Sequence, residues 1–296
     1  MSESSPSPGP ILVVGATGNI GHHVVAGLVA AGADVRAAAR NPASLTDRWG
    51  GDITSVAFDF ADASTWAAAF DGVATAYLMR PPHISNIKRD MEPALRAMEA
   101  AGVRHVVLLS VMGAADMPWV PHAKIEAWLK QSSMSWTFIR PSFFMENLST
   151  THARAITHRD QIIVPAGGGK TSFVAATDVA AVCCTALLDP TTHRNTSWTP
   201  TGGTALSYYA AASILTDVLG RNVEYRRPGI PRYAAHARRD LDLPWPMLAT
   251  TIAIYTVARL GRAAEVTNDI RTVSGRPPMT LREWAREHRR AWEGGT

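Results

Sequence analysis

Cysteine and long apolar runs are both scarce in this sequence, and each scarcity excludes a class of protein. Only two of the 296 residues are cysteines, Cys183 and Cys184, which are neighbours in an apolar, helix-like stretch. Neighbouring helical positions point to different faces, so we expect two small core residues and neither a disulfide nor a metal pair. No apolar run reaches the roughly 18 residues of a membrane-spanning helix, and residues 247–260, the nearest candidate, predict a buried helix or the wall of a pocket. We therefore expect a cytoplasmic protein without membrane contacts.

Charge of one sign is not concentrated either. The 29 basic and 25 acidic residues give a formal net charge of +4, and the arginine-rich stretch 282–290 is typical of a solvated helix face. The histidines lack metal-site spacing to one another or to carboxylates. No G-x-S-x-G motif occurs. These absences disfavour nucleic-acid binding, a metal centre and serine-hydrolase chemistry.

The sequence does contain a regular alternation of short β-rich runs and helical stretches. Such an alternation implies right-handed βαβ crossovers and a parallel sheet with helices on both faces, which places the chain in the α/β class. The predicted strands span residues 11–14, 34–39, 54–58, 74–79, 106–110 and 136–139, and the predicted helices between them span 22–31, 65–70, 90–101 and 122–131.

Beyond Pro141 the pattern loosens, and proline and glycine become frequent. We expect a disordered Ser/Pro-rich arm over residues 1–10, a dinucleotide-binding domain over 11–150 and a smaller C-terminal α/β lobe for the substrate over 151–296, partly interleaved with the first. The elements predicted in the second half are strands at 173–175 and 222–225 and helices at 178–187, 206–219 and 281–292.

A glycine-rich loop follows the first predicted strand and opens the first helix. Its spacing is GxxGxxG: Gly15 allows a tight exit from the strand, Gly18 lets backbone N–H groups approach a diphosphate, and Gly21 allows close packing of helix on sheet. The helix N-terminus adds a positive dipole. Glycines of this kind also occur in caps and turns, but the strand before and the helix after favour a Rossmann-type, doubly wound sheet that binds a dinucleotide. The predicted ligand residues are Gly15, Thr17, Gly18, Asn19, Ile20 and Gly21.

The end of the second strand selects the nucleotide. An acidic residue there would hold a ribose 2′-hydroxyl, but Asp34 lies at the start of that strand. The strand ends in Arg40, which can fork onto a 2′-phosphate with Arg36 as a helper, unless Arg40 is simply a surface arginine. We therefore predict NADP(H) in preference to NAD(H).

These motifs resemble the short-chain dehydrogenase/reductase superfamily, and within it the atypical, NmrA-like NAD(P)-binding branch. That branch includes NADPH-dependent reductases of quinones, azo and triphenylmethane dyes and iminium compounds, and also regulators that bind the dinucleotide without turning it over. The likeness extends over nearly all of residues 11–290. It rests on the segments 15–21 with 40–42, TFIRP at 137–141, FFMEN at 143–147, FV at 173–174, TDVA at 177–180 and GRPP at 275–278.

The resemblance implies further site residues at the carboxyl ends of the strands. It places the adenine beside Asp59 and Phe60, the ribose and nicotinamide beside Met79 and Arg80, and the substrate in an apolar loop after strand six; each of these positions has a loop-cap, surface or core alternative. The implied cofactor contacts are Asp59, Phe60, Met79, Arg80, Ser110, His122, Pro141 and Phe143, and the implied substrate contacts are Phe143, Phe144, Met145 and Asn147.

The usual proton donor of the superfamily is missing. Ordinary members place a Tyr-x-x-x-Lys pair on the helix after strand five. Counting back from Pro141 puts the tyrosine position at Pro118 and the lysine position at His122. His122, with a reference pKa near neutrality, is a candidate acid or ribose contact, or else a solvent-facing residue. Ser110 is a candidate substrate-orienting hydroxyl or a turn residue, and Lys124 is a third candidate.

Loss of the tyrosine favours an acceptor that is already activated, with catalysis supplied largely by proximity to the nicotinamide. We predict an NADPH-dependent reductase that transfers hydride to an apolar, conjugated small molecule of the quinone, azo, iminium or enone type. Two alternatives stay open: a non-catalytic NAD(P)-sensing regulator, and an isomerase or cyclase that retains its cofactor. The expected partner is a small-molecule substrate, and both a monomer and a homodimer fit the sequence.

Overall fold

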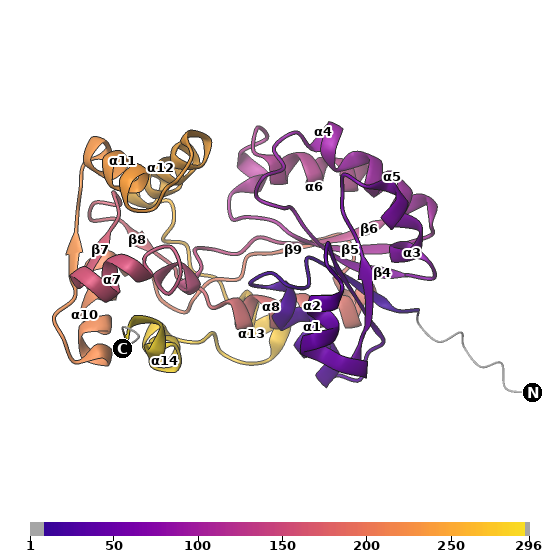
Figure 1. The fold of residues 1–296 in the computed structure, drawn as a ribbon, viewed down its shortest axis with the longest axis horizontal. Coiled ribbons are helices and arrows are strands. Elements are labelled where there is room, and N and C mark those ends of the chain that lie inside the picture. The colour runs from indigo at the N-terminus through magenta and orange to yellow at the C-terminus, as the bar shows by residue number, and fades with distance from the viewer. Residues whose placement is uncertain (1–8, 294–296) are drawn as a thin grey trace, which may run out of the picture. The chain divides into compact units, whose positions relative to one another are not determined.

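The computed structural model describes residues 9–293, apart from the side chain of Pro246, so residues 1–8 of the predicted arm lie outside the described part. A seven-stranded parallel sheet has the order β3-β2-β1-β4-β5-β6-β9 (Figure 1). The strand order reverses between β1 and β4, which is the switch point of a Rossmann sheet, and the predicted fold class is confirmed. The strands are β1 (Ile11–Val14), β2 (Val35–Ala39), β3 (Thr54–Ala57), β4 (Thr75–Met79), β5 (His105–Leu109), β6 (Ser135–Ile139) and β9 (Thr196–Trp198).

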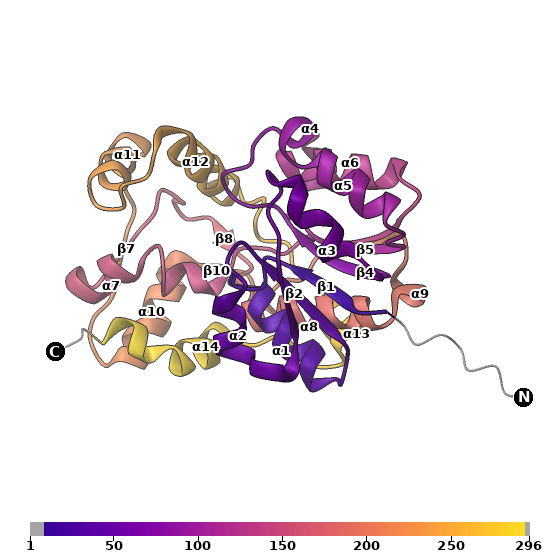
Figure 2. The ribbon, with the colours of Figure 1, turned by 45° about the vertical axis from the view of Figure 1, so that its right-hand side comes forward.

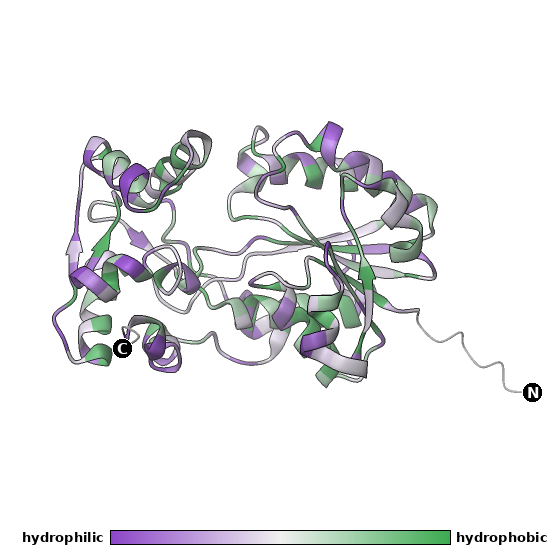
Figure 3. Ribbon diagram, in the orientation of Figure 1, coloured by the Kyte–Doolittle hydropathy of each residue, from purple (hydrophilic) through white to green (hydrophobic). Residues whose placement is uncertain are grey.

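The strands are short and apolar because both faces of the sheet are covered. Leu12, Leu78 and Leu108 on neighbouring strands are fully buried, and Figure 3 shows β4 among the hydrophobic segments. In Figures 1 and 2, α1 and α2 lie on one face and α3 to α6 on the other. These helices are α1 (Gly21–Ala30), α2 (Ala43–Trp49), α3 (Trp66–Phe70), α4 (Ile87–Asp90), α5 (Glu92–Ala100) and α6 (Pro121–Gln131).

The two cysteines lie on α8 (Ala176–Leu188), and both are buried core residues, as the sequence predicts. The Cys184 thiol donates to the carbonyl oxygen of Val24 on α1 at 3.4 Å. A Cβ on Gly27 would lie only 2.7 Å from the Cys184 Sγ, so a glycine in α1 allows this helix pair to pack closely.

The chain divides into two compact units that interleave along the sequence. The first unit contains the residues up to Pro141 together with 179–200 and 272–275, and the second contains 142–178, 201–271 and the residues from Arg276 on. The second unit has two small sheets, β7 (Gln161–Ile163) with β11 (Glu224–Arg226) in parallel and β8 (Lys170–Thr171) with β10 (Leu206–Ser207) antiparallel. Its helices are α7 (Ala153–Arg159), α10 (Tyr208–Leu219), α11 (Ile230–Arg239), α12 (Trp245–Arg259) and α14 (Leu281–Glu287).

Three predicted elements of the second half are wrong in detail. Residues 173–175 form no strand, since Val174 makes only an isolated bridge with Phe144. The helix predicted from 206 begins at Tyr208, because Leu206 and Ser207 form β10 and the Ser207 hydroxyl accepts a bond from Ala210 N at 3.2 Å as the helix cap. The last helix ends at Glu287 and is followed by a separate 3-10 turn.

The helix predicted from the apolar run 247–260 exists as α12, but it is only half buried. Leu248, Tyr255 and Ala258 face the core of the second unit, whereas Leu260 is 67% exposed and Ile254 is 45% exposed. Of the helices that the structure describes, none has the length and apolar character to cross a membrane.

Candidate functional site

The glycine loop closes on itself between β1 and α1. Gly15 has a φ of +74°, and its carbonyl oxygen accepts a bond from Gly18 N at 2.9 Å. A Cβ on Gly21 would lie 2.2 Å from that same carbonyl oxygen, which no side chain tolerates. The loop therefore needs glycine at its first and last positions, and its backbone is available for close approach by an anion.

Helix α1 begins directly from this loop with a bare N-terminus. It has no side-chain cap and no acidic residue in its first turn, so the positive end of its dipole is not neutralised locally. Thr17 and Asn19 are exposed on the loop, whereas Ile20 is buried and anchors it. This arrangement fits the diphosphate of a dinucleotide.

Arg40 directly follows β2, as predicted from the sequence. It is exposed and has no hydrogen-bond or ion-pair partner among residues 9–293. Arg36 does not help it, and that expectation is wrong: the Arg36 guanidinium donates to the carbonyl oxygens of Ala68 and Asp71 and so caps the end of α3. Of the two arginines predicted for a 2′-phosphate, Arg40 is the one whose guanidinium is not engaged within the described residues.

The ends of β3 and β4 present the other predicted cofactor residues. Asp59 Oδ1 accepts a bond from Ala61 N at 2.9 Å as a turn cap, and Phe60 is buried in edge contact with Phe58. Met79 does lie beside the glycine loop, since its Cγ would be 2.9 Å from a Cβ on Gly15. The Arg80 Nη1 donates to the carbonyl oxygens of residues 81, 82 and 84, and burial lowers the pKa of Arg80. Arg80 thus orders the loop after β4.

A buried polar network joins β5, β6 and the helix that connects them. The Ser110 hydroxyl donates to Glu126 Oε1 at 2.6 Å, and Arg140 grips the same carboxylate through Nε (3.0 Å) and Nη2 (2.6 Å). Ser110 and Glu126 are 2% and 3% exposed. The fork is the bidentate geometry in which an arginine binds a carboxylate most strongly. Since the single hydroxyl proton is given to Glu126, Ser110 has none to donate to a substrate, and its substrate-orienting role stays a prediction.

Glu126 was not predicted from the sequence, although the sequence contains a signal for it. Glu126 lies four residues after His122 on the same helix, and Arg140 directly follows the next strand, β6. A carboxylate on the buried, apolar face of a helix needs a cationic partner. Arg140 of the 137–141 segment is such a cation.

His122 lies in the first turn of α6, one residue after the helix begins at Pro121. Burial, with a smaller contribution from the charge of Arg80, lowers the pKa of His122 to about 4, and the Glu126 carboxylate opposes that shift. The ring is therefore neutral at pH 7 and suits hydrogen bonding better than proton donation. Lys124 is exposed on the same helix, and Pro118 is exposed in the turn before it.

The predicted substrate segment, residues 143–147, belongs to the second unit. Pro141 is buried and belongs to the first unit. Phe143 is half-buried against Phe173 and Tyr255. Phe144 bridges to Val174, and Met145 is 1% exposed in the core. Asn147 follows in a 3-10 turn and is half-buried.

Glu146, which lies within this segment, has a structural role. Its Oε1 accepts bonds from Ala176 N at 2.9 Å and from Trp284 Nε1 at 3.1 Å. Asp178 of the 177–180 motif similarly accepts from Met279 N at 2.7 Å, just after the 275–278 motif. Residues in or beside the 143–147, 177–180 and 275–278 motifs are therefore connected by hydrogen bonds inside the second unit.

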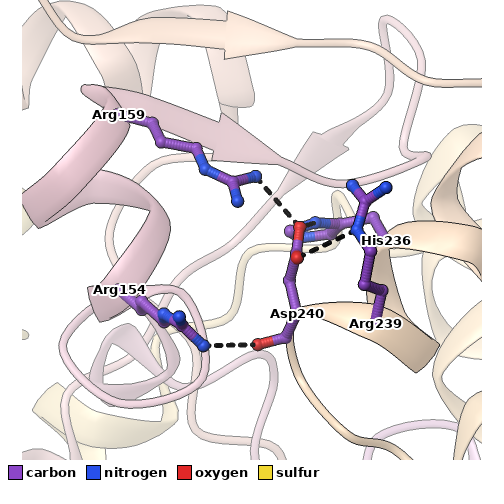
Figure 4. Close-up of polar contacts among 5 residues, drawn as sticks. All are labelled: Arg154, Arg159, His236, Arg239 and Asp240. Carbon is purple, nitrogen blue, oxygen red and sulfur yellow. Dashed lines mark hydrogen bonds and ion pairs between the residues drawn. The ribbon is translucent and has the colours of Figure 1, made fainter.

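A second polar cluster surrounds Asp240 at the end of α11 (Figure 4). Its carboxylate accepts bonds from Arg239, Arg159 and His236, which hold the pKa of Asp240 well below its usual range. The His236 Nδ1–Asp240 Oδ2 distance is 2.7 Å. The i, i+4 spacing places the two on one helix face, and this ion pair was not predicted from the sequence. The cluster joins α7 to α11 and is a structural feature of the second unit.

Comparison with known proteins agrees with the geometry of the loop. Residues 15–190 match the NAD(P)H-binding family. An NAD(P)H azoreductase of Xenophilus azovorans is 33% identical over 291 residues, which cover 95% of this chain and 99% of the relative. A (4-alkanoyl-5-oxo-2,5-dihydrofuran-3-yl)methyl phosphate reductase of Streptomyces griseus is 31% identical over 287 residues, which cover 95% and 99%. The NADPH complex of the quinone oxidoreductase QOR2 of Escherichia coli shares the fold, with a TM-score of 0.82 at 24% identity over 94% of this chain and 99% of that one.

Substitution of Gly21 by alanine tests the loop. The new Cβ would collide with the Gly15 carbonyl, so we expect the Kd for NADPH to rise about tenfold or more, because overpacking typically costs about 1–3 kcal/mol. The matched control is Gly51→Ala, where a Cβ meets nothing within 4 Å. Fluorescence titration measures both variants, and equal affinity for NADPH in G21A and G51A would contradict the assignment.

The protonation state of His122 can be measured directly. Because burial lowers its pKa to about 4, its imidazole resonances in the cofactor-free protein should not shift between about pH 8 and about pH 5.5. A ring with an ordinary pKa would titrate with a midpoint near 6.5. The His122→Asn variant identifies the signal in a histidine-labelled NMR spectrum, and a midpoint near neutrality would restore the acid role.

Proposed function

The chain belongs to the NAD(P)H-binding family, in its NmrA-like branch of atypical short-chain dehydrogenases/reductases, and on this basis we propose that it reduces an apolar, conjugated small molecule with NADPH. Its relatives at 33% and 31% identity are named an azoreductase and a reductase, which supports an NAD(P)H-dependent oxidoreductase. The acceptor class is the proposal: a quinone, azo, iminium or enone group, each of which accepts a hydride at an already electron-poor atom.

The residues that would hold the cofactor are those of the glycine loop, the bare start of α1 and Arg40. The loop and the helix dipole suit the diphosphate, and the exposed guanidinium of Arg40 suits a 2′-phosphate. The cofactor, when bound, supplies a hydride, that is, two electrons and one hydrogen nucleus. The protein's own contribution is to hold the nicotinamide and the acceptor close together.

The observation that carries the acceptor class is that the described residues at the carboxyl ends of β5 and β6 include no suitable general acid. Pro118 stands at the tyrosine position, His122 is neutral at pH 7, and the Ser110 proton is held by Glu126. An unactivated ketone needs a proton delivered to its oxygen as the hydride arrives. An iminium carbon needs none, and a reduced quinone or azo group takes its proton from water.

The relatives support the same class. One is named for the reduction of azo compounds and another for an oxo-dihydrofuran methyl phosphate. The missing acid equally suits a regulator that binds NADPH without consuming it, which is the competing function, and a cofactor-retaining isomerase or cyclase is a third.

A panel of acceptors separates these functions. We expect the purified protein to consume NADPH with naphthoquinones, azo dyes, imines or enones, and to leave unactivated ketones unreduced. Absorbance at the NADPH band follows the reaction. Tight NADPH binding without consumption for any acceptor would favour the regulator, and rapid reduction of simple ketones would contradict the argument from the missing acid.

Arg40 should set the preference for NADPH. In Arg40→Ser the Kd for NADPH should rise about tenfold, the loss expected for one charge-assisted contact of about 1.4 kcal/mol, while the Kd for NADH should hardly change. Arg48→Ser on α2 removes the same charge from an exposed arginine and serves as the control. Parallel losses for both nucleotides in R40S would show that Arg40 does not contact the 2′-phosphate.

A further inference from the structure

A polar hollow lies at the amino edge of the central sheet, at the opposite ends of the strands from the glycine loop. Its cavity of about 640 Å³ is lined in part by Thr75, His105 and Ser135, the first residues of β4, β5 and β6. The residues that line it all belong to the first unit. Parallel strands begin at one edge and end at the other, so this cavity is separate from the predicted cofactor site.

Positive charge predominates in the hollow. Arg104 precedes β5, Lys130 lies near the end of α6, and Arg194 follows α9 (Pro190–His193); all three are exposed. The guanidinium groups of Arg104 and Arg194 have no hydrogen-bond or ion-pair partner among residues 9–293. The Lys130 ammonium lies 5.5 Å from the centre of the Trp136 ring, which also lines the hollow. Cations from three separate elements therefore line one cavity.

The acidic residue of the lining, Glu99, is already bound to the main chain. Its Oε1 accepts bonds from Ser133 N at 2.6 Å and from Ser133 Oγ at 2.8 Å, and these bonds lower the pKa of Glu99. Three cations and one carboxylate leave the lining with a net positive charge. Most of the remaining polar lining consists of hydroxyl and amide side chains, those of Thr75, Ser132, Ser133, Ser135, Thr191 and Asn195.

The imidazole of His105 is buried beside these cations and is 2% exposed. Its Nδ1 lies 2.9 Å from Ser135 Oγ, and its Nε2 lies 3.1 Å from Thr137 Oγ1. Each hydroxyl can also donate to a main-chain carbonyl oxygen, Ser135 to that of Arg104 at 3.0 Å and Thr137 to that of His193 at 2.7 Å. Because a hydroxyl both donates and accepts, the neutral ring and the protonated ring are each fully hydrogen-bonded here.

The protonation state of this ring depends on the charge around it. Burial lowers the pKa of His105 to about 4, with smaller contributions from the charges of His193 and Arg194. Tyr77, which shares this face of the sheet, and Cys183 beside it are uncharged at pH 7 because burial raises the pKa of both. An anion in the hollow would offset the charges of the cations and of the protonated ring, and would therefore favour protonation.

We propose that this hollow is a second ligand site, which binds a hydroxylated small molecule with a dianionic oxyanion such as a phosphate monoester, and that His105 takes up a proton when the anion binds. Arg104, Lys130 and Arg194 bind the oxyanion, since guanidinium and ammonium groups suit phosphate. A cavity of about 640 Å³ is far larger than a bare oxyanion needs, and its hydroxyl and amide lining suits a polar remainder.

A purely structural role makes different predictions. His105 would then only tie β5 to β6, and the two arginines would be ordinary solvated side chains. Loss of His105 would lower the thermal stability, and an anion would bind this hollow no better than any other pair of exposed arginines.

Calorimetry with ribose 5-phosphate at pH 7.5 tests the site. With the cofactor site saturated with NADP⁺, we expect ribose 5-phosphate to bind about tenfold more tightly than inorganic sulfate, because only the sugar reaches the hydroxyl lining, and ribose not to bind measurably. The variant R104Q/R194Q should weaken both anions about tenfold or more. The control R48Q/R89Q removes two exposed arginines of α2 and α4 and should change neither affinity. Equal losses in the two double variants, or no binding of ribose 5-phosphate by the wild-type protein, overturns the proposal.

Sulfate also reports the proton, because its own charge is constant between about pH 5.5 and about pH 7.5. If the bound anion favours the protonated ring, affinity rises as the pH falls. An opposite charge within about 4–6 Å raises a histidine pKa by about 1–3, so the affinity for sulfate should rise about fourfold from pH 7.5 to pH 5.5. In His105→Gln it should stay constant. A pH dependence that is retained in H105Q overturns the role of His105.

NMR of the wild-type protein decides the same point even if H105Q does not fold. The His105 imidazole signal, assigned through its own backbone resonances, should titrate with a midpoint that moves upward when sulfate is added. A midpoint that sulfate leaves unchanged contradicts proton uptake. These measurements need no turnover, so they decide the site whether or not the protein reduces any acceptor.

Discussion

The parallel order of the central sheet is the constraint on which the rest of the first unit depends. Parallel strands must return by crossovers, so every carboxyl end lies at one edge and the helices begin at that same edge. This is why the glycine loop after β1, Arg40 after β2, Met79 at the end of β4 and Ser110 after β5 are gathered there although the chain separates them by up to about 95 residues. The switch between β1 and β4 opens the place for the dinucleotide.

The buried Glu126 carboxylate secures that edge. It is bound at once by the hydroxyl after β5 and by the guanidinium after β6, so the crossover helix α6 is attached to both strands that it connects. Removing one partner of a buried, fully paired carboxylate is costly. These bonds therefore hold the N-terminal half of α6 in place. His122 lies one turn before Glu126 on α6, so the same bonds hold its backbone in place.

Much of this could be predicted from the sequence. The α/β class and the NAD(P)-binding family follow from periodicity, from glycine spacing and from the resemblance, and the structure and the comparisons confirm them. The seventh strand β9 was not predicted, because Thr196–Trp198 is a three-residue element with little pattern of its own. The structural use of Arg36 was missed for another reason: its partners are backbone carbonyls, and these leave no mark in the sequence. The half-exposed face of α12 was missed because an apolar run does not reveal which of its sides is covered.

Pro118 has a consequence for the range of molecules that such a site can process. A tyrosine at this position would donate its proton at a fixed distance from the nicotinamide. The site would then accept only compounds whose proton-accepting atom lies at that distance from the atom that takes the hydride. Because a proline stands there and the Ser110 proton is held by Glu126, neither side chain imposes this distance. Under the proposed function, compounds as unlike as a ring dione and an azo compound would meet the same geometric demand, and shape would limit which of them the site accepts.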